Sequence, residues 1–170
     1  QNSEVATELS RMMESFRIAV FQINTHQDLI FHIEENGTGF RRARMPQRFS
    51  EYIQKRVESG RIAPESREEY LRWLEKGYLQ RKTALGPYIV ETCLKDIGDV
   101  DFRWYRETIV AVKDRPGLFM RWRKDDTEGH RADEAERKKK ELARVMEYTG
   151  QMLDTMASLV EFRSIESSHH

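Results

Sequence analysis

The chain has 170 residues, of which 34% are charged and 38% apolar, and its 29 basic and 29 acidic side chains give a formal net charge of zero. A neutral chain exerts no overall attraction on nucleic acid or an anionic membrane, so we predict no nucleic-acid partner. Its one cysteine, Cys93, excludes an internal disulfide and a cysteine-rich zinc site, and is expected to be a small buried hydrophobe.

The first element predicted is a helix over residues 3–35, because apolar residues recur there at alternating intervals of four and three. This spacing places one stripe on one helix face and predicts packing against a second helix. His26 occupies a position of the same stripe. The residues of this N-terminal stripe that we expect to pair are Leu9, Met12, Phe16, Ile23 and Ile30.

The middle of the chain is predicted to form further helices joined by Gly and Pro turns. A polar connection over residues 41–46 precedes a short amphipathic helix from Phe49 to Val57. A longer helix begins at Pro64, a residue that suits the first helical turn, and continues to Ile97 with a kink at Pro87. A fourth helix over residues 102–112 and an apolar turn over residues 118–122 complete this region.

The last element predicted is a second long heptad helix that ends near residue 162. The fold class expected is therefore all-α, an antiparallel helical bundle with long terminal helices and a Pro-kinked middle helix. We treat residues 1–166 as one domain and residues 167–170 as a probable tag remnant. The C-terminal stripe predicted to pair consists of Leu142, Val145, Met152, Met156 and Leu159.

Three groups of residues are candidates for function. Arg41, Arg42 and Arg44 follow a Gly-rich turn, where guanidinium groups can clamp an anion, although a solvated loop has the same composition. A pocket for a small anionic or aromatic ligand is predicted near Tyr88 and Trp104, at the Pro87 kink.

His26 is the third candidate, since an imidazole in an apolar stripe is either a pH sensor or a device that sets helix register. The simpler alternative is an imidazole that is hydrogen-bonded to a neighbour or reaches solvent at the edge of the bundle.

The sequence lacks the motifs of common enzymes. Paired Glu-x-x-His motifs, His-Glu-x-x-His, a phosphate-binding Gly-x-x-x-x-Gly-Lys-Ser/Thr loop and Gly-x-Ser-x-Gly are all missing. We therefore predict no enzymatic activity, no cofactor and no metal site.

Two hypotheses for function remain. The first is a helical sensor or regulatory module of a signalling protein, and the second is a self-associating scaffold or protein-interaction domain. The length of the terminal stripes favours a homodimer through the terminal helices, which the second hypothesis predicts without a ligand, whereas a sensor should show ligand-dependent stability. No run of 18 apolar residues occurs, so membrane attachment is expected only through segments outside this sequence. A cytoplasmic protein and the extracytoplasmic part of a membrane protein are both compatible with these observations.

Overall fold

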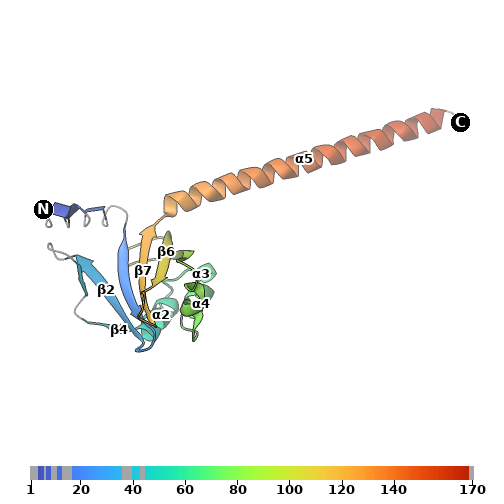
Figure 1. Cartoon of the computed structure of the whole chain (residues 1–170). Helices are drawn as coiled ribbons and strands as arrows, with labels where there is room; N and C mark the ends of the chain where they lie inside the picture. Colours follow the sequence, from blue (N-terminus) through green and yellow to red (C-terminus); the bar gives the residue numbers. More distant parts are fainter. Residues whose placement is uncertain are drawn as a thin grey trace. The chain divides into compact units, whose positions relative to one another are not determined.

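The computed structural model describes residues 4–5, 7–8, 11–12, 17–35, 40–42 and 45–168. It divides the chain into two compact units, Gln1–Thr127 and Glu128–His170. The first is an α/β unit built around one antiparallel sheet (Figure 1), and the second is the greater part of a single long helix.

The sheet of the α/β unit places the first and last strands at its centre. The spatial order is β3-β2-β1-β7-β6-β5, every neighbouring pair is antiparallel, and β4 pairs separately with β2. The strands are β1 (Ala19–Asn24), β2 (Leu29–Glu35), β3 (Phe40–Arg42), β4 (Gln47–Arg48), β5 (Tyr88–Leu94), β6 (Arg103–Ala111) and β7 (Leu118–Asp125).

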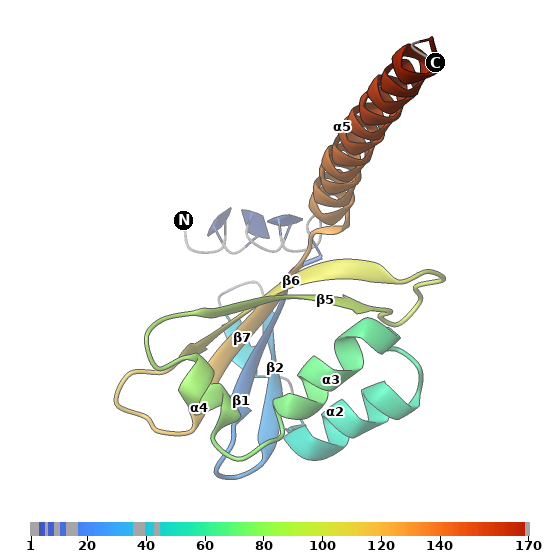
Figure 2. The same ribbon diagram turned by 90° about the vertical axis from the view of Figure 1, so that its right-hand side faces the viewer.

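Three helices between β4 and β5 cover one face of the sheet (Figure 2). They are α2 (Phe49–Glu58), α3 (Pro64–Arg72) and α4 (Tyr78–Lys82). The start of α2 is held by Asp28 in the β1–β2 turn, whose carboxylate accepts hydrogen bonds from the backbone N–H of Ser50 at 2.8 Å and from its hydroxyl at 2.5 Å. This carboxylate fixes α2 against the hairpin, because it satisfies a donor that the helix itself cannot.

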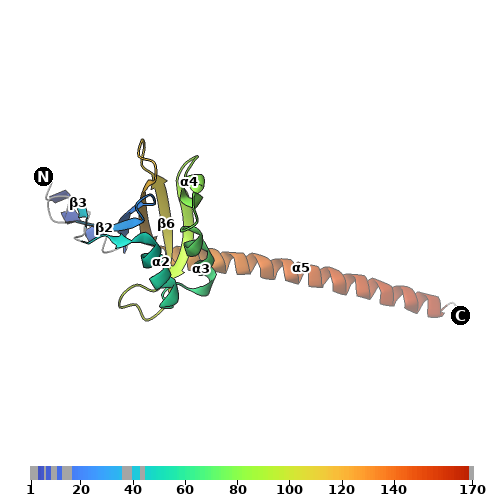
Figure 3. The ribbon, with the colours of Figure 1, turned by 90° about the horizontal axis from the view of Figure 1, so that it is seen from below.

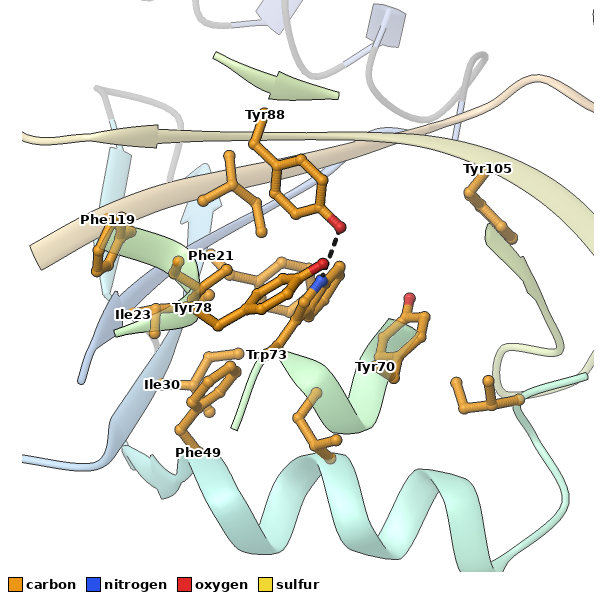
Figure 4. Packing of buried hydrophobic residues seen from close by; sticks show 14 of the residues in the cluster. Phe21, Ile23, Ile30, Phe49, Tyr70, Trp73, Tyr78, Tyr88, Tyr105 and Phe119 are labelled. Atoms are coloured by element: carbon orange, nitrogen blue, oxygen red, sulfur yellow. Dashed lines mark hydrogen bonds between the residues drawn. The ribbon is translucent and has the colours of Figure 1, made fainter. Parts of the chain in front are cut away.

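The core lies between the helices and the inner face of the sheet (Figure 4). Side chains alternate between the two faces of a strand, and in β1 the inward residues are Phe21 and Ile23. Trp73 donates a hydrogen bond from its indole N–H to the hydroxyl of Tyr88, with 3.2 Å between Nε1 and Oη. This bond satisfies two polar atoms that would otherwise be costly to bury.

The prediction of an all-α bundle is wrong. Residues 19–35 form the β1–β2 hairpin instead of one helix, and Ile23 and Ile30 are direct partners across it, both buried in the core. Leu9 and Phe16 of the N-terminal stripe lie outside the described residues, and Met12 is exposed. The helix-pairing role predicted for Ile23 and Ile30 is therefore wrong, because both side chains lie on strands and pack in the core between the sheet and the helices.

The middle region mixes correct and incorrect predictions. The helix at Phe49 and the helix start at Pro64 are confirmed by α2 and α3. The kink at Pro87 is wrong, since the chain there leaves α4 and enters β5. The predicted fourth helix is the strand β6, and the apolar turn over residues 118–122 belongs to β7.

The C-terminal helix predicted from the heptad is present as α5 (Thr127–Ser168), a continuous helix of 42 residues (Figure 3). It begins at Thr127, within the charged segment of residues 123–140 that we predicted to be a loop followed by a solvated helix start. Among the described residues, no helix combines the length and the hydropathy needed to cross a membrane. The C-terminal stripe is exposed along α5: Leu142, Val145, Met152, Met156 and Leu159.

Candidate functional site

The inner face of the sheet carries a fully buried ion pair between Glu107 of β6 and Arg121 of β7. Arg121 donates from Nε to Glu107 Oε1 at 2.7 Å, while the hydroxyls of Tyr70 and Thr92 donate to Oε2. The guanidinium of Arg121 also lies 5.1 Å from the centre of the Trp73 ring system. Every oxygen of the carboxylate is thus hydrogen-bonded, which a buried charge requires.

These contacts set the protonation state of the pair. Burial alone would raise the pKa of the Glu107 carboxyl, but the charge of Arg121 and the hydrogen bond from Tyr70 hold that pKa below its usual value. Burial, followed by the charge of Glu107, raises the pKa of the Tyr70 hydroxyl. Glu107 is therefore ionised and Tyr70 is neutral at neutral pH.

A second polar group adjoins this pair, at Arg123 on the same face of β7. Arg123 Nη2 lies 2.6 Å from Asp96 Oδ2, and Arg56 Nη2 of α2 lies 3.6 Å from the other carboxylate oxygen. The Arg123 guanidinium stacks near the rings of Phe21 and Tyr105, at 5.5 and 5.2 Å from their centres. Arg123 is held between a carboxylate and two aromatic rings, in a nearly buried position.

The carboxyl of Asp96 responds to these neighbours. Burial would raise its pKa, but the charges of Arg123 and Arg56 and a hydrogen bond from the Ile97 backbone hold the pKa below its usual value. Asp96 is therefore ionised and bridges the strand β7 and the helix α2 by charge.

A cavity of about 680 Å³ opens beside this second group, and we call it the arginine cleft. Its volume is within the range of small-molecule sites. Its walls combine charged with apolar side chains: Arg17, Ile18, Ala19, Phe21, His32, Ile33, Glu34, Gln47, Tyr52, Arg56, Asp96, Ile97 and Arg123.

Several buried donors at the arginine cleft have no acceptor among the described residues. They are Nε and Nη1 of Arg123, Nη1 of Arg56 and the hydroxyl of Tyr52. A buried N–H or O–H without a partner costs about 1–3 kcal/mol, so such groups are uncommon in native proteins. Each of these atoms is itself enclosed by protein atoms, so it is not open to a molecule in the cleft.

The junction between β7 and α5 lies at the end of the same strand. Asp125 accepts hydrogen bonds from the backbone N–H of Thr127 at 3.0 Å and from its hydroxyl at 2.6 Å. The hydroxyl of Thr127 in turn accepts from the backbone N–H of Trp104 at 3.1 Å. Burial would raise the pKa of Asp125, but the Thr127 hydrogen bonds and Arg103 hold it below its usual value. Thr127, the first residue of α5, is thus tied to both β6 and β7.

Arg17 links the arginine cleft to this junction. Its Nη2 lies 2.7 Å from Asp99 Oδ1, and its Nε lies 4.0 Å from Asp125 Oδ2. One side chain that lines the cleft therefore also lies near the carboxylate that accepts from Thr127.

The sequence-predicted ligand residues do not gather at one site. Arg41 and Arg42 are exposed on β3, where the Arg42 guanidinium lies 4.8 Å from the centre of the Phe31 ring. Arg44 lies outside the described residues. The predicted polar loop at Arg41 and Arg42 is a strand, and neither residue lines the arginine cleft.

Tyr88 and Trp104 were predicted to share a pocket, and this arrangement is wrong. Tyr88 faces the core with Thr92 on β5, and Thr92 is the cross-strand partner of Tyr105. Trp104 adjoins Tyr105 in β6, so the alternation of side chains sends it to the opposite face.

His26 was predicted to lie in the stripe of a helix, and the helix is wrong. It is exposed in the turn between β1 and β2, beside Gly117 of the β6–β7 turn. The tight approach of these two turns explains its position, and the heptad argument for register does not apply.

Sequence reasoning missed Arg123, which lines the cleft, and Arg121, which forms the buried ion pair beside it. Arg121 and Arg123 stand two apart in an eight-residue strand, LFMRWRKD, in which their spacing places both on one face. The signal available was this alternation, but we assigned residues 118–122 to an apolar turn and residues 123–140 to a loop followed by a helix start. The expectation for Cys93 is confirmed, since the thiol is buried and burial raises its pKa to about 11.

Within the described residues, no three His, Cys, Asp or Glu side chains are grouped as metal ligands would be. No protein-family model matches the sequence. No curated protein matches it either.

Two solved structures resemble the chain in three dimensions. One is a sensory box histidine kinase/response regulator from Burkholderia thailandensis, with a TM-score of 0.49 and 18% identity over 80% of this chain and 97% of that chain. The other is an RNA-binding light-oxygen-voltage receptor, with a TM-score of 0.42 and 19% identity over 65% of this chain and 30% of that one.

Proposed function

We propose that this chain is a non-enzymatic sensor or regulatory module, in which the state of the α/β unit is passed on through α5. The observation that carries the proposal is the junction between β7 and α5. β7 bears Arg121 and Arg123 on its inner face and ends at Asp125, and α5 begins at Thr127 without an intervening loop.

The route from the cleft to the helix is short. A shift of the Arg123 guanidinium acts on the strand that ends in Asp125, and a shift of Arg17 acts on the Asp125 carboxylate itself. Two arrangements of these ion pairs would give two states of the first turn of α5. A ligand can then select between the states by binding one of them more tightly.

The partner that receives this change is proposed to be a second copy of the chain, paired through α5. The stripe from Leu142 to Leu159 keeps a spacing of 3.5 residues and is exposed along its length. A stripe of this kind is self-complementary, because two copies of the helix present the same residues to each other.

Coupling is tested by hydrogen exchange at the start of α5. Arg56→Gln removes one arm of the Asp96 bridge without touching the junction, and we expect amide exchange over residues 127–140 to change by about threefold or more. Arg106→Gln, on the exposed outer face of β6, is the matched control and should leave exchange unchanged. Equal exchange in the two variants and the wild type would remove the case for a sensor.

The scaffold hypothesis keeps one specific observation in its favour, the exposed stripe itself. Sedimentation of Met152→Glu against Gln151→Glu tests it, since both add one negative charge but only Met152 lies on the stripe. We expect Met152→Glu to weaken dimerisation by about 100-fold and Gln151→Glu to have little effect. A dimer that forms through α5 but ignores the Arg56 change would favour the scaffold.

A further inference from the structure

One face of the sheet is left uncovered by the three short helices. α2, α3 and α4 all pack against the inner face, and we call the opposite side the outer face (Figure 2). Side chains alternate along a strand, so cross-strand partners define rows on each face. One row of the outer face crosses all six strands of the main order: Arg42, Ile33, Val20, Trp122, Thr108 and Ile89.

The centre of the outer face is apolar. Trp122 is 37% exposed and Ile89 is 50% exposed, although both are large apolar side chains. The neighbouring row places Phe31, Met120 and Val110 around a single polar residue, Gln22. A continuous apolar surface with polar residues at its margin marks a contact site in a soluble protein.

The charged residues of the outer face are mainly basic. The strand positions of this face hold four basic and two acidic residues: Arg42, Arg48, Arg106, Lys124, Glu35 and Glu91. These strand positions therefore carry two net positive charges. They favour an occupant that is apolar on one side and acidic overall.

The N-terminal segment, residues 1–16, has the complementary pattern. Its charged residues are three acidic and one basic: Glu4, Glu8, Glu14 and Arg11. Its larger apolar residues include four at intervals of four, three and four, which places them on one side of a helix: Val5, Leu9, Met12 and Phe16. Residues 4–5, 7–8 and 11–12, which the structure describes, are helical, and Val5 and Met12 are exposed there.

The short connection to β1 favours the segment of the same chain as the occupant. Only Arg17 and Ile18 separate Phe16 from the start of β1, so Phe16 stays within about 11 Å of that strand end. Val20, next to this end, is the cross-strand partner of Trp122. A tether of this length gives the segment a high effective concentration at the outer face. The outer face of a second copy is a poorer occupant, because two faces with the same net positive charge repel each other.

We infer that residues 1–16 dock as an amphipathic helix on the outer face of their own sheet, with the apolar side of the helix against Trp122 and Val20. The glutamates of the segment then lie among the basic side chains of that face. This contact is separate from the proposed sensor function, because neither the arginine cleft nor α5 takes part in it.

The contact is tested on the full chain by photo-cross-linking. Benzoylphenylalanine replaces either Met12, on the apolar side of the helix, or Ser10, which lies about 200° around the helix from Met12. Ordinary and isotope-labelled chains are mixed in equal amounts, and mass spectrometry identifies the joined peptides. We expect position 12 to cross-link to β1, β6 or β7 within one chain, with a yield about fivefold or more above that from position 10.

Thermal unfolding gives an independent measurement. Met12→Glu places a charge in the proposed contact, whereas Ser10→Glu adds the same charge on the other side of the helix. We expect Met12→Glu to lower the melting temperature by about 3 °C or more and Ser10→Glu to leave it unchanged. Without docking, neither substitution would change the melting temperature, because Met12 would be exposed to solvent.

Four results would overturn the inference. They are the absence of cross-links from position 12 to the sheet, equal yields from positions 10 and 12, cross-links that join only labelled to unlabelled chains, and an unchanged melting temperature for Met12→Glu. The third result would place the segment on a second copy of the chain instead of on its own sheet.

Discussion

The buried pair of Glu107 and Arg121 allows the sharpest test of the packing described above. Glu107→Gln preserves the shape of the side chain but removes its charge, and Arg121 is then left charged and fully buried. Breaking a buried pair from one side costs about 3–5 kcal/mol. Tyr70 and Thr92 both donate to the carboxylate, and an amide nitrogen at that position cannot accept from them. We therefore expect a loss in the upper part of that range.

The assay is urea unfolding followed by far-UV circular dichroism, with Glu58→Gln on the exposed end of α2 as the control. The double variant Glu107→Met/Arg121→Met should recover much of the loss, because no unpaired charge remains in the core. A cost below about 1 kcal/mol for Glu107→Gln would refute the reasoning. The reasoning would also be refuted if the double variant lost as much stability as Glu107→Met and Arg121→Met lose together as single variants.

The remaining predictions concern stability at low pH and the replacement of two glycines by alanine. The pKa values of Asp96 and Asp125 are held below their usual level in the folded protein. Their contribution to stability is therefore present above the unfolded pKa of about 3.9 and is lost as pH falls through the folded pKa. Thermal scans from pH 7 to pH 3 should show the melting temperature fall mainly below about pH 4.5, and a flat profile there would contradict the lowered pKa values. Gly117→Ala should destabilise the α/β unit by about 1–3 kcal/mol, because φ is +81° and a Cβ would lie 2.7 Å from the His26 ring. Gly150→Ala in α5 is its control, where a Cβ meets nothing within 4 Å, and calorimetry should show no loss.

The sequence predicted best the elements whose signals are local. Pro64 marks the start of α3 because its fixed φ and missing N–H suit the first helical turn. The amphipathic pattern from Phe49 likewise belongs to one helix, α2, and the charged heptads of the C-terminal part form α5. In each case, neighbours in the sequence are also neighbours in space.

The hairpin was missed because its geometry imitates a heptad. Ile23 and Ile30 are seven residues apart, which is two turns of a helix, but they are also direct partners across β1 and β2. The polar run between them, with Asp28 at φ +53°, is a turn that a helix cannot contain. The same misinterpretation placed His26 on a helix face.

The arginine cleft could not have been predicted from local pattern. Arg56 and Arg123 come from segments far apart in the sequence, and Asp96 joins them from the connection after β5. Only the strand order, with β1 between β2 and β7, brings these segments together.

That strand order also bears on how the α/β unit is synthesised. β1 and β7 are direct neighbours at the centre of the sheet, with Ala19 opposite Arg123, although about a hundred residues separate them in the chain. Contacts between such distant segments form slowly, because a long loop must close first. On the ribosome, β1 has its hairpin partner early but must wait for β7 until nearly the whole unit has emerged. Until then, one edge of β1 is an unpaired strand edge, which is open to pairing with another chain.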